Sequence, residues 1–304
     1  MKKKLKKRYK FIPFVSILLL VVLSCSEERE FKRKCDAGDH FACTWYQKNK
    51  ICPTGRSADK GSCKWLSYYN SCRKGDMDSC SNLGVMYRNG ESVDQNFDAS
   101  YDIFKKSCEG GSLEGCFNLG LAYEGGWGIH HDFLLASELY KEVCEKGVAI
   151  GCYNLAVMYI SGKELNRNYK FAAELLEKAC EGNYMWGCYN LGVMHSRGEG
   201  VEKNHDKAFD LYRKVCESGD SWGCYNLAGA YFSGKGAERN YTKAYAIYDR
   251  ICKTGDMESC YNMAIMHISG LGVSTNLNKA NELLKEACHG GFYDACEKII
   301  ELNI

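Results

Sequence analysis

Apolar and polar residues follow one pattern that recurs along most of the chain. Six segments each begin at a cysteine and place apolar side chains three or four positions apart, as at Leu83, Met86 and Tyr87. Because this spacing lines one face of an α-helix, each segment is predicted to be helical. A glycine follows each segment, which suits the end of a helix or the turn after it. These glycines are Gly90, Gly126, Gly162, Gly198, Gly234 and Gly270.

A second helical run follows each glycine, as in residues 97–108 and 170–180. An asparagine or aspartate precedes each run at about the N-cap position, where its side chain can accept a backbone hydrogen bond. Each unit is therefore predicted to contain a helix A, a loop, a helix B and a tight turn, without strands. The N-cap candidates are Asn96, Asp132, Asn168, Asn204, Asn240 and Asn276.

Cysteines mark the period of this pattern. The first cysteines of the units lie 36 residues apart, and a second cysteine follows each after 8 residues. Cys35 and Cys43 open the series with the same spacing, one residue out of phase, and Cys25, Cys52 and Cys63 stand outside it. The first cysteines are Cys72, Cys108, Cys144, Cys180, Cys216, Cys252 and Cys288.

The shared pattern LGxxY…G…KAxxLYxKAC resembles the Sel1-like repeat, a relative of the tetratricopeptide repeat, over about residues 30 to 302. The C-x7-C pair in each unit is similar to the cysteine-rich, secreted bacterial branch of that family, the Hcp type. The first unit departs from the pattern, because it lacks the LG pair and contains Cys52 and Cys63. The expected fold class is all-α, an α/α solenoid of about seven 36-residue helix-turn-helix repeats with a disulfide in each repeat.

The paired cysteines are expected to form disulfides, because a tight turn brings the end of helix B close to the start of the next helix A. A metal site is the competing interpretation, but the x7 spacing is not that of zinc fingers, and the absence of C-x-x-C disfavours a redox enzyme. No metal or cofactor is expected. The predicted bridges are Cys35–Cys43, Cys52–Cys63, Cys72–Cys80, Cys108–Cys116, Cys144–Cys152, Cys180–Cys188, Cys216–Cys224, Cys252–Cys260 and Cys288–Cys296.

The N-terminus carries an export pattern. A basic stretch precedes a 13-residue apolar run at 11–23, too short to span a bilayer comfortably, and Val22 to Cys25 resembles a bacterial lipobox. We expect a signal peptide at 1–24, a lipidated Cys25 with a short tether at 25–34, and the repeats at 35–302. The protein would then be membrane-anchored in the periplasm or at the surface of a bacterium. An uncleaved anchor or a simple secretory signal is the alternative.

Composition sharpens this picture. The 40 Lys/Arg and 38 Asp/Glu give a formal charge of +2, but seven of the basic residues and no acid lie in 1–24. The remainder carries a net charge of −5, which argues against nucleic acid as a partner. The 19 cysteines fit one lipidation site plus nine disulfides.

Helix A lines the concave face in the tetratricopeptide family, so the resemblance places variable residues of helix A in a groove that binds a protein or an extended peptide. Aromatic residues gather in the middle units there, and an asparagine ladder could hold a peptide backbone. The alternatives are that the tyrosines pack between adjacent helices A and that each asparagine bonds the neighbouring repeat. The candidate peptide-binding residues are Tyr153, Tyr189, Tyr225, Trp186, Trp222, Asn118, Asn154, Asn190 and Asn226.

A hydrolase is the runner-up, since some proteins of the cysteine-rich branch are described as penicillin-binding or weak β-lactamases. Residues 57–60 match S-x-x-K and residues 253–255 match K-T-G by letter, whereas S-D-N is absent. The K-T-G match falls where other units have an inter-helix turn. No catalytic residue is therefore assigned, and His130, His131, His195 and His267 form no predicted cluster.

Overall fold

The computed structural model describes residues 60–162 and 165–302. Within these residues the chain forms α-helices joined by loops and turns, with no strand. The predicted all-α repeat solenoid is confirmed. The helices are α3 (Lys60–Arg73), α4 (Met77–Asn89), α5 (Phe97–Glu109), α6 (Leu113–Gly125), α7 (Phe133–Glu145), α8 (Ala149–Ser161), α9 (Tyr169–Glu181), α10 (Met185–Arg197), α11 (His205–Glu217), α12 (Ser221–Ser233), α13 (Tyr241–Cys252), α14 (Met257–Ser269), α15 (Leu277–His289) and α16 (Tyr293–Leu302).

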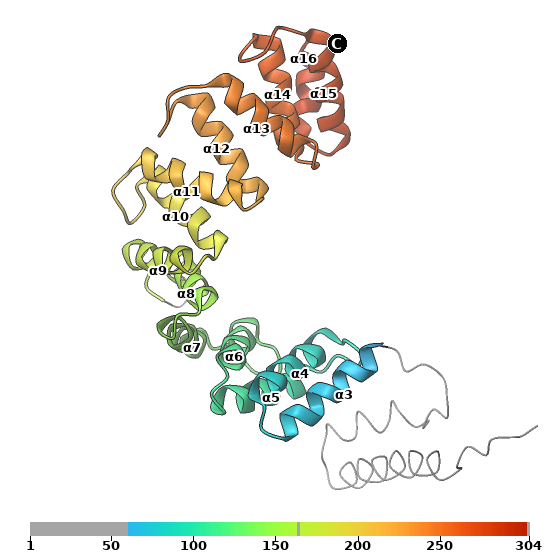
Figure 1. Cartoon of the computed structure of the whole chain (residues 1–304), viewed down its shortest axis with the longest axis vertical. Coiled ribbons are helices and arrows are strands. Elements are labelled where there is room, and N and C mark those ends of the chain that lie inside the picture. Colours follow the sequence, from blue (N-terminus) through green and yellow to red (C-terminus); the bar gives the residue numbers. More distant parts are fainter. Residues whose placement is uncertain (1–59, 163–164, 303–304) are drawn as a thin grey trace, which may run out of the picture. The chain divides into compact units, whose positions relative to one another are not determined.

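The helices fall into two compact units that meet in sequence between Asp132 and Phe133. In the first unit, each helix from α3 to α6 packs against the next, and in the second unit each helix from α7 to α16 does the same. The order of the helices can be followed by colour in Figure 1. Even-numbered helices from α4 onward correspond to the predicted helices A, and odd-numbered helices to helices B. Each unit therefore buries its apolar residues mainly between neighbours in sequence.

Local sequence sets the helix ends. Asn204, for example, precedes α11, and its side chain accepts a hydrogen bond from the backbone N–H of Lys207 at 2.9 Å. The same cap begins α5, α9, α13 and α15. At the other end of helix A, Gly198 takes a left-handed conformation with φ 78°, and Asn183 does so in the tight turn at φ 60°. The predicted caps are confirmed at these positions.

Small residues allow the helices to approach closely. Ala136, Ala172, Ala244 and Ala280 are fully buried in four helices B, α7, α9, α13 and α15. Gly223 near the start of α12 faces α11, and a Cβ atom there would lie 2.5 Å from a Val215 methyl carbon. A larger side chain at this position would therefore push the two helices apart.

Within the described residues, seven disulfides close the tight turns, and each joins an odd-numbered helix to the next even-numbered one. Their Cα atoms lie between 4.3 and 4.9 Å apart, and each spans eight residues, so each stabilises its turn by about 2–3 kcal/mol in the loop-entropy account. They confirm seven predicted bridges: Cys72–Cys80, Cys108–Cys116, Cys144–Cys152, Cys180–Cys188, Cys216–Cys224, Cys252–Cys260 and Cys288–Cys296.

The remaining cysteine predictions, Cys25, Cys35–Cys43 and Cys52–Cys63, lie outside the part of the chain whose side chains the structure describes. The predicted segments 1–24 and 25–34 lie outside it as well. In the described part, no helix combines the length and apolar character that crossing a membrane requires.

Two glycines of α12 should respond oppositely to substitution by alanine. We expect Gly223→Ala to lower stability by about 1–3 kcal/mol, because the new methyl group meets Val215 and the Cys216 backbone nitrogen. We expect Gly229→Ala to raise it by about 0.5–1 kcal/mol, because a Cβ atom there meets only the Tyr248 hydroxyl, at 3.8 Å, and alanine favours helix. Urea unfolding of both variants under non-reducing conditions measures the difference. Equal shifts of the two midpoints would contradict this account of α12.

Candidate functional site

The aromatic residues predicted to bind a partner lie on three helices A of the second unit. We call Tyr153 of α8, Trp186 and Tyr189 of α10, and Trp222 and Tyr225 of α12 the aromatic face. The two tryptophan side chains are exposed, Trp186 at 42% and Trp222 at 56%. Such exposed indole rings are unusual on a surface that contacts only water.

The tyrosines of the aromatic face are half-buried and serve packing as well. Their rings lie beside the following turn or helix B. Tyr189 lies 6.2 Å from Tyr212 between ring centres, and Tyr225 lies 5.8 Å from Tyr248. Burial, together with a hydrogen bond donated to Glu258, raises the pKa of Tyr225 to about 12. Tyr189 and Tyr225 pack on helix B and also bond the next helix A. The Tyr189 hydroxyl accepts from Asn226, and the Tyr225 hydroxyl bonds Glu258 and Asn262, which is the contact between helices A that the alternative interpretation expects.

The asparagine series divides into bonded and unbonded members. The Asn226 amide donates to the Tyr189 hydroxyl of the preceding repeat at 3.3 Å and to the Trp222 carbonyl at 3.0 Å. Asn118 of the first unit is buried and donates to the Ser81 hydroxyl at 3.1 Å. The carboxamides of Asn154 and Asn190 form no hydrogen bond within the described residues. Asn118 and Asn226 thus bond the preceding repeat, whereas the carboxamides of Asn154 and Asn190 make no such bond.

Acidic residues take the place of the tryptophans in the first unit. Asp78 accepts a hydrogen bond from the Ser112 hydroxyl at 2.6 Å, which ties α4 to the start of α6. Burial, and the neighbouring Asp78 charge, raise the pKa of Glu114. Asp78 therefore has a structural partner within its own unit.

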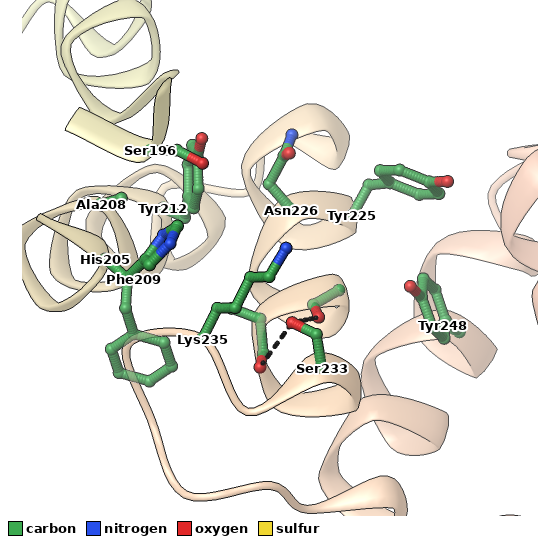
Figure 2. A pocket seen from close by; sticks show the side chains of 12 residues that line it. Ser196, His205, Ala208, Phe209, Tyr212, Tyr225, Asn226, Ser233, Lys235 and Tyr248 are labelled. Carbon is green, nitrogen blue, oxygen red and sulfur yellow. Dashed lines mark hydrogen bonds between the residues drawn. The ribbon is translucent and has the colours of Figure 1, made fainter. Parts of the chain in front are cut away.

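A pocket of about 200 Å³ opens beside the aromatic face at α12. Figure 2 shows its lining side chains, which come from α10, α11, α12, α13 and the loop after α12. Sequence reasoning missed the pocket, although a signal exists. Gly229 stands where the other repeats carry a branched apolar residue: Val85, Leu121, Val157, Val193 and Ile265.

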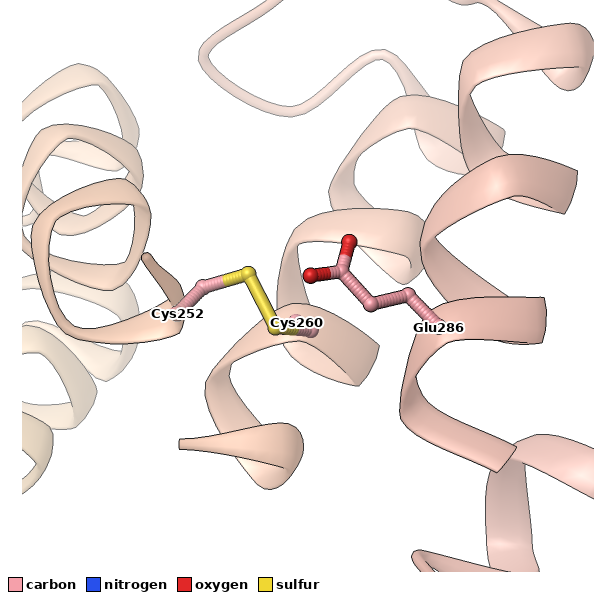
Figure 3. Close-up of side chains that lie close together, drawn as sticks. All are labelled: Cys252, Cys260 and Glu286. Atoms are coloured by element: carbon pink, nitrogen blue, oxygen red, sulfur yellow. A yellow bond between two sulfur atoms is a disulfide. The ribbon is translucent and has the colours of Figure 1, made fainter. Parts of the chain in front are cut away.

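The residue two positions before a first cysteine reaches a sulfur of the preceding repeat's disulfide at Lys214 and at Arg250. Arg250 donates from one nitrogen to the sulfurs of Cys216 and Cys224, at 2.8 Å each. In the next repeat this position is Glu286, whose carboxylate lies within 4.8 Å of the Cys252 and Cys260 sulfurs (Figure 3). Those sulfurs are bonded to each other, so neither is the thiolate that a metal ion would need.

The hydrolase motif match at 253–255 lies in the turn between α13 and α14. The Thr254 hydroxyl donates to the Ile251 carbonyl at 2.7 Å, and the Lys253 ammonium pairs with Asp249 at 2.6 Å. These contacts belong to an inter-helix turn, as the repeat pattern predicts. Ser57 lies outside the described residues. His195 and His267 each lie beside a backbone carbonyl of their own repeat's loop.

Successive helix pairs, closed by disulfides and carrying a partly exposed aromatic face, define a helical repeat protein of a class that typically binds other proteins. The family model of the Sel1 repeat matches residues 78–112, 113–148, 149–184, 187–220, 223–256 and 258–292. The chain therefore belongs to the Sel1 repeat family, and the resemblance seen in the sequence is confirmed. Sel1 repeat proteins bind proteins.

Solved structures of Sel1-like repeat (SLR) proteins share this architecture. A protective antigen of uropathogenic Escherichia coli strains that displays an SLR fold is 26% identical with a TM-score of 0.73, over 88% of this chain and 57% of that one. This chain therefore spans little more than half of that relative. A Sel1 repeat protein from Oxalobacter formigenes is 22% identical with a TM-score of 0.61, over 76% of this chain and 97% of that one.

Cysteine-rich protein B of Helicobacter pylori is 30% identical over 45% of this chain and 98% of that one, with a TM-score of 0.34. No curated protein matches the chain.

The disulfides that Arg250 and Glu286 contact should differ in reactivity. A cation stabilises both the attacking and the leaving thiolate, whereas a carboxylate repels them. We therefore expect limiting dithiothreitol to reduce Cys216–Cys224 severalfold faster than Cys252–Cys260, as measured by differential alkylation and mass spectrometry. Arg250→Glu should remove the difference. The control is Arg213→Gln, since Arg213 lines the same surface hollow as Cys216 and pairs with Asp210. Equal rates in the unmodified chain would contradict this prediction.

Proposed function

We propose that the chain is an exported, lipid-anchored repeat protein that binds a protein or an extended peptide along the aromatic face. The observation that carries this proposal is the exposure of Trp186 and Trp222 on consecutive helices A, at equivalent positions 36 residues apart. Large aromatic side chains at partly exposed positions are typical centres of binding energy. No metal or nucleic acid is needed for such a role.

The asparagines give this surface its backbone-binding capacity. The Asn154 and Asn190 carboxamides each offer a donor and an acceptor, which match the C=O and N–H of an extended peptide. They lie on α8 and α10, each one residue after a tyrosine of the aromatic face. A peptide could therefore place side chains on the rings while its backbone bonds to the carboxamides.

Export rests on two observations. Seven disulfides in the described residues fit an oxidising compartment rather than the cytosol. The basic and apolar segments of 1–24, followed by Cys25, have the order of a lipoprotein signal. Anchoring at Cys25 would hold the repeats at a membrane surface, and mass spectrometry of the mature N-terminus would detect the lipid.

Removing either tryptophan should abolish most of the binding. Peptides selected from a random linear library on the unmodified chain provide the ligands, and fluorescence anisotropy measures their affinity. We expect Trp186→Ala and Trp222→Ala each to weaken binding by about thirtyfold, which corresponds to a hot spot of about 2 kcal/mol. Tyr293→Ala is the matched control, because Tyr293 is an 80% exposed aromatic on α16. Unchanged affinity in both tryptophan variants would refute the assignment of this surface.

Asparagine variants separate the binding role from the structural one. Asn226→Ala breaks the bond to Tyr189 and should cost about 1 kcal/mol of stability. Asn154→Ala and Asn190→Ala break no bond of the described residues, so their melting temperatures should stay unchanged while peptide affinity falls. Thermal melts and anisotropy of the same preparations check both statements. A large loss of stability in the Asn190 variant would show that this asparagine is structural.

A further inference from the structure

The pocket beside the aromatic face owes its existence to a missing side chain. Gly229 faces it from α12, and a Cβ atom at this position would meet only the Tyr248 hydroxyl, 3.8 Å away. The equivalent residue of the preceding helix A, α10, is Val193, and that of the following one, α14, is Ile265. Because a glycine inside a helix weakens it, the position costs stability that a valine would restore. A ligand group that occupies the space beside Gly229 would account for this loss of stability.

A tyrosine hydroxyl borders the space that Gly229 leaves. Tyr248 is only 5% exposed, and its hydroxyl forms no hydrogen bond within the described residues. Burial raises the pKa of Tyr248, so the hydroxyl keeps its proton at neutral pH and remains a donor. Because this hydroxyl lines the pocket and has no partner among the described residues, it can donate a hydrogen bond to a group that enters the pocket.

Among the lining residues, Lys235 carries the only formal charge, whereas the acids Glu258 and Asp256 act on Tyr248 from outside the lining. Lys235 reaches it from the loop after α12, and Figure 2 shows its side chain directed toward the middle of the lining residues. The Lys235 ammonium forms no ion pair within the described residues, and none of the pocket's lining side chains is a carboxylate. His205 adds a further imidazole. The nearby Glu258 accepts a hydrogen bond from the Tyr225 hydroxyl.

The size of the pocket limits what can enter it. A volume of about 200 Å³ lies below the range typical of sites for drug-sized molecules. It suits one side chain of a longer ligand. Tyr225 and Asn226 both line the pocket, and they share a helical stripe with Trp222. A chain lying on the aromatic face can therefore lower a side chain into it.

We propose that this pocket receives a carboxylate of the bound protein or peptide, held by the Lys235 ammonium and the Tyr248 hydroxyl. The proposal rests on the proposed function and adds a preference for an acidic residue at one position of the ligand. The carboxylate belongs either to an aspartate or glutamate side chain or to a chain terminus. Hydrogen bonds from an ammonium and a hydroxyl to a carboxylate are charge-assisted and shorter than neutral ones.

Small blocked amino acids test the pocket without the rest of the ligand. The ¹⁵N-labelled, disulfide-bonded full chain is titrated with N-acetyl-glutamate methylamide, its glutamine counterpart and N-acetyl-alanine, while the Asn226 and Ala230 amide signals are followed. We expect saturable shifts with the glutamate compound and at least tenfold weaker binding of the glutamine compound. N-acetyl-alanine distinguishes a terminal carboxylate from a side-chain carboxylate, because it carries only the former.

Three variants complete the test. Gly229→Val fills the pocket with the side chain that Val193 supplies in the preceding repeat, and should abolish the shifts while the melting temperature stays the same or rises. Lys235→Gln should weaken binding at least tenfold. Lys207→Gln removes an exposed charge of α11 outside the pocket and should leave binding unchanged.

Binding of neither carboxylate, equal binding of the glutamine compound, or undiminished binding by Gly229→Val would each overturn the proposal. Peptide affinity that still depends on Trp222 would then show that the aromatic face binds a ligand without using this pocket. Loss of the tryptophan dependence would instead refute the proposed function itself.

Discussion

A covalent closure over eight residues determines how each repeat is built. A disulfide of this span requires one helix to end and the next to begin within a few residues, with their ends almost in contact. The left-handed residue of the turn and the small residue at Gly223 are needed because the closure holds the two helix ends so near each other. The short distance between the two helix ends also lets side chains of one repeat contact the neighbouring repeat. Arg250, for example, donates to a sulfur of the preceding disulfide.

Stability and binding compete for the same few positions on α10 and α12. Tyr225 packs on Tyr248 and donates to Glu258, yet it remains partly exposed. Asn226 is held by Tyr189, whereas Asn190, its equivalent one repeat earlier, has no such bond. Equivalent residues thus make different contacts in adjacent repeats. Variation between repeats, rather than any single motif, distinguishes the parts of the surface that are free to meet a partner.

The sequence was sufficient wherever structure depends on near neighbours in the chain. The cap at Asn204 and the bridge Cys180–Cys188 each involve residues at most eight positions apart, so a local pattern predicts them. The Asn226–Tyr189 bond spans 37 positions, and its presence depends on small differences in helix packing that no local pattern contains. The pocket at Gly229 could have been found from the sequence by comparing repeats, but the orientation of Tyr248 and Lys235 toward it could not.

The placement of the disulfides also determines how such a chain would carry tension. Each disulfide links the two ends of the turn between an odd-numbered and an even-numbered helix. A pulling force therefore cannot extend those eight-residue segments while the sulfurs stay bonded. The loops that follow the even-numbered helices, such as the one that leads from α10 to α11, have no bridge. A stretched chain would therefore part at these loops and keep its bridged helix pairs as intact links, which limits the extension and favours recoil.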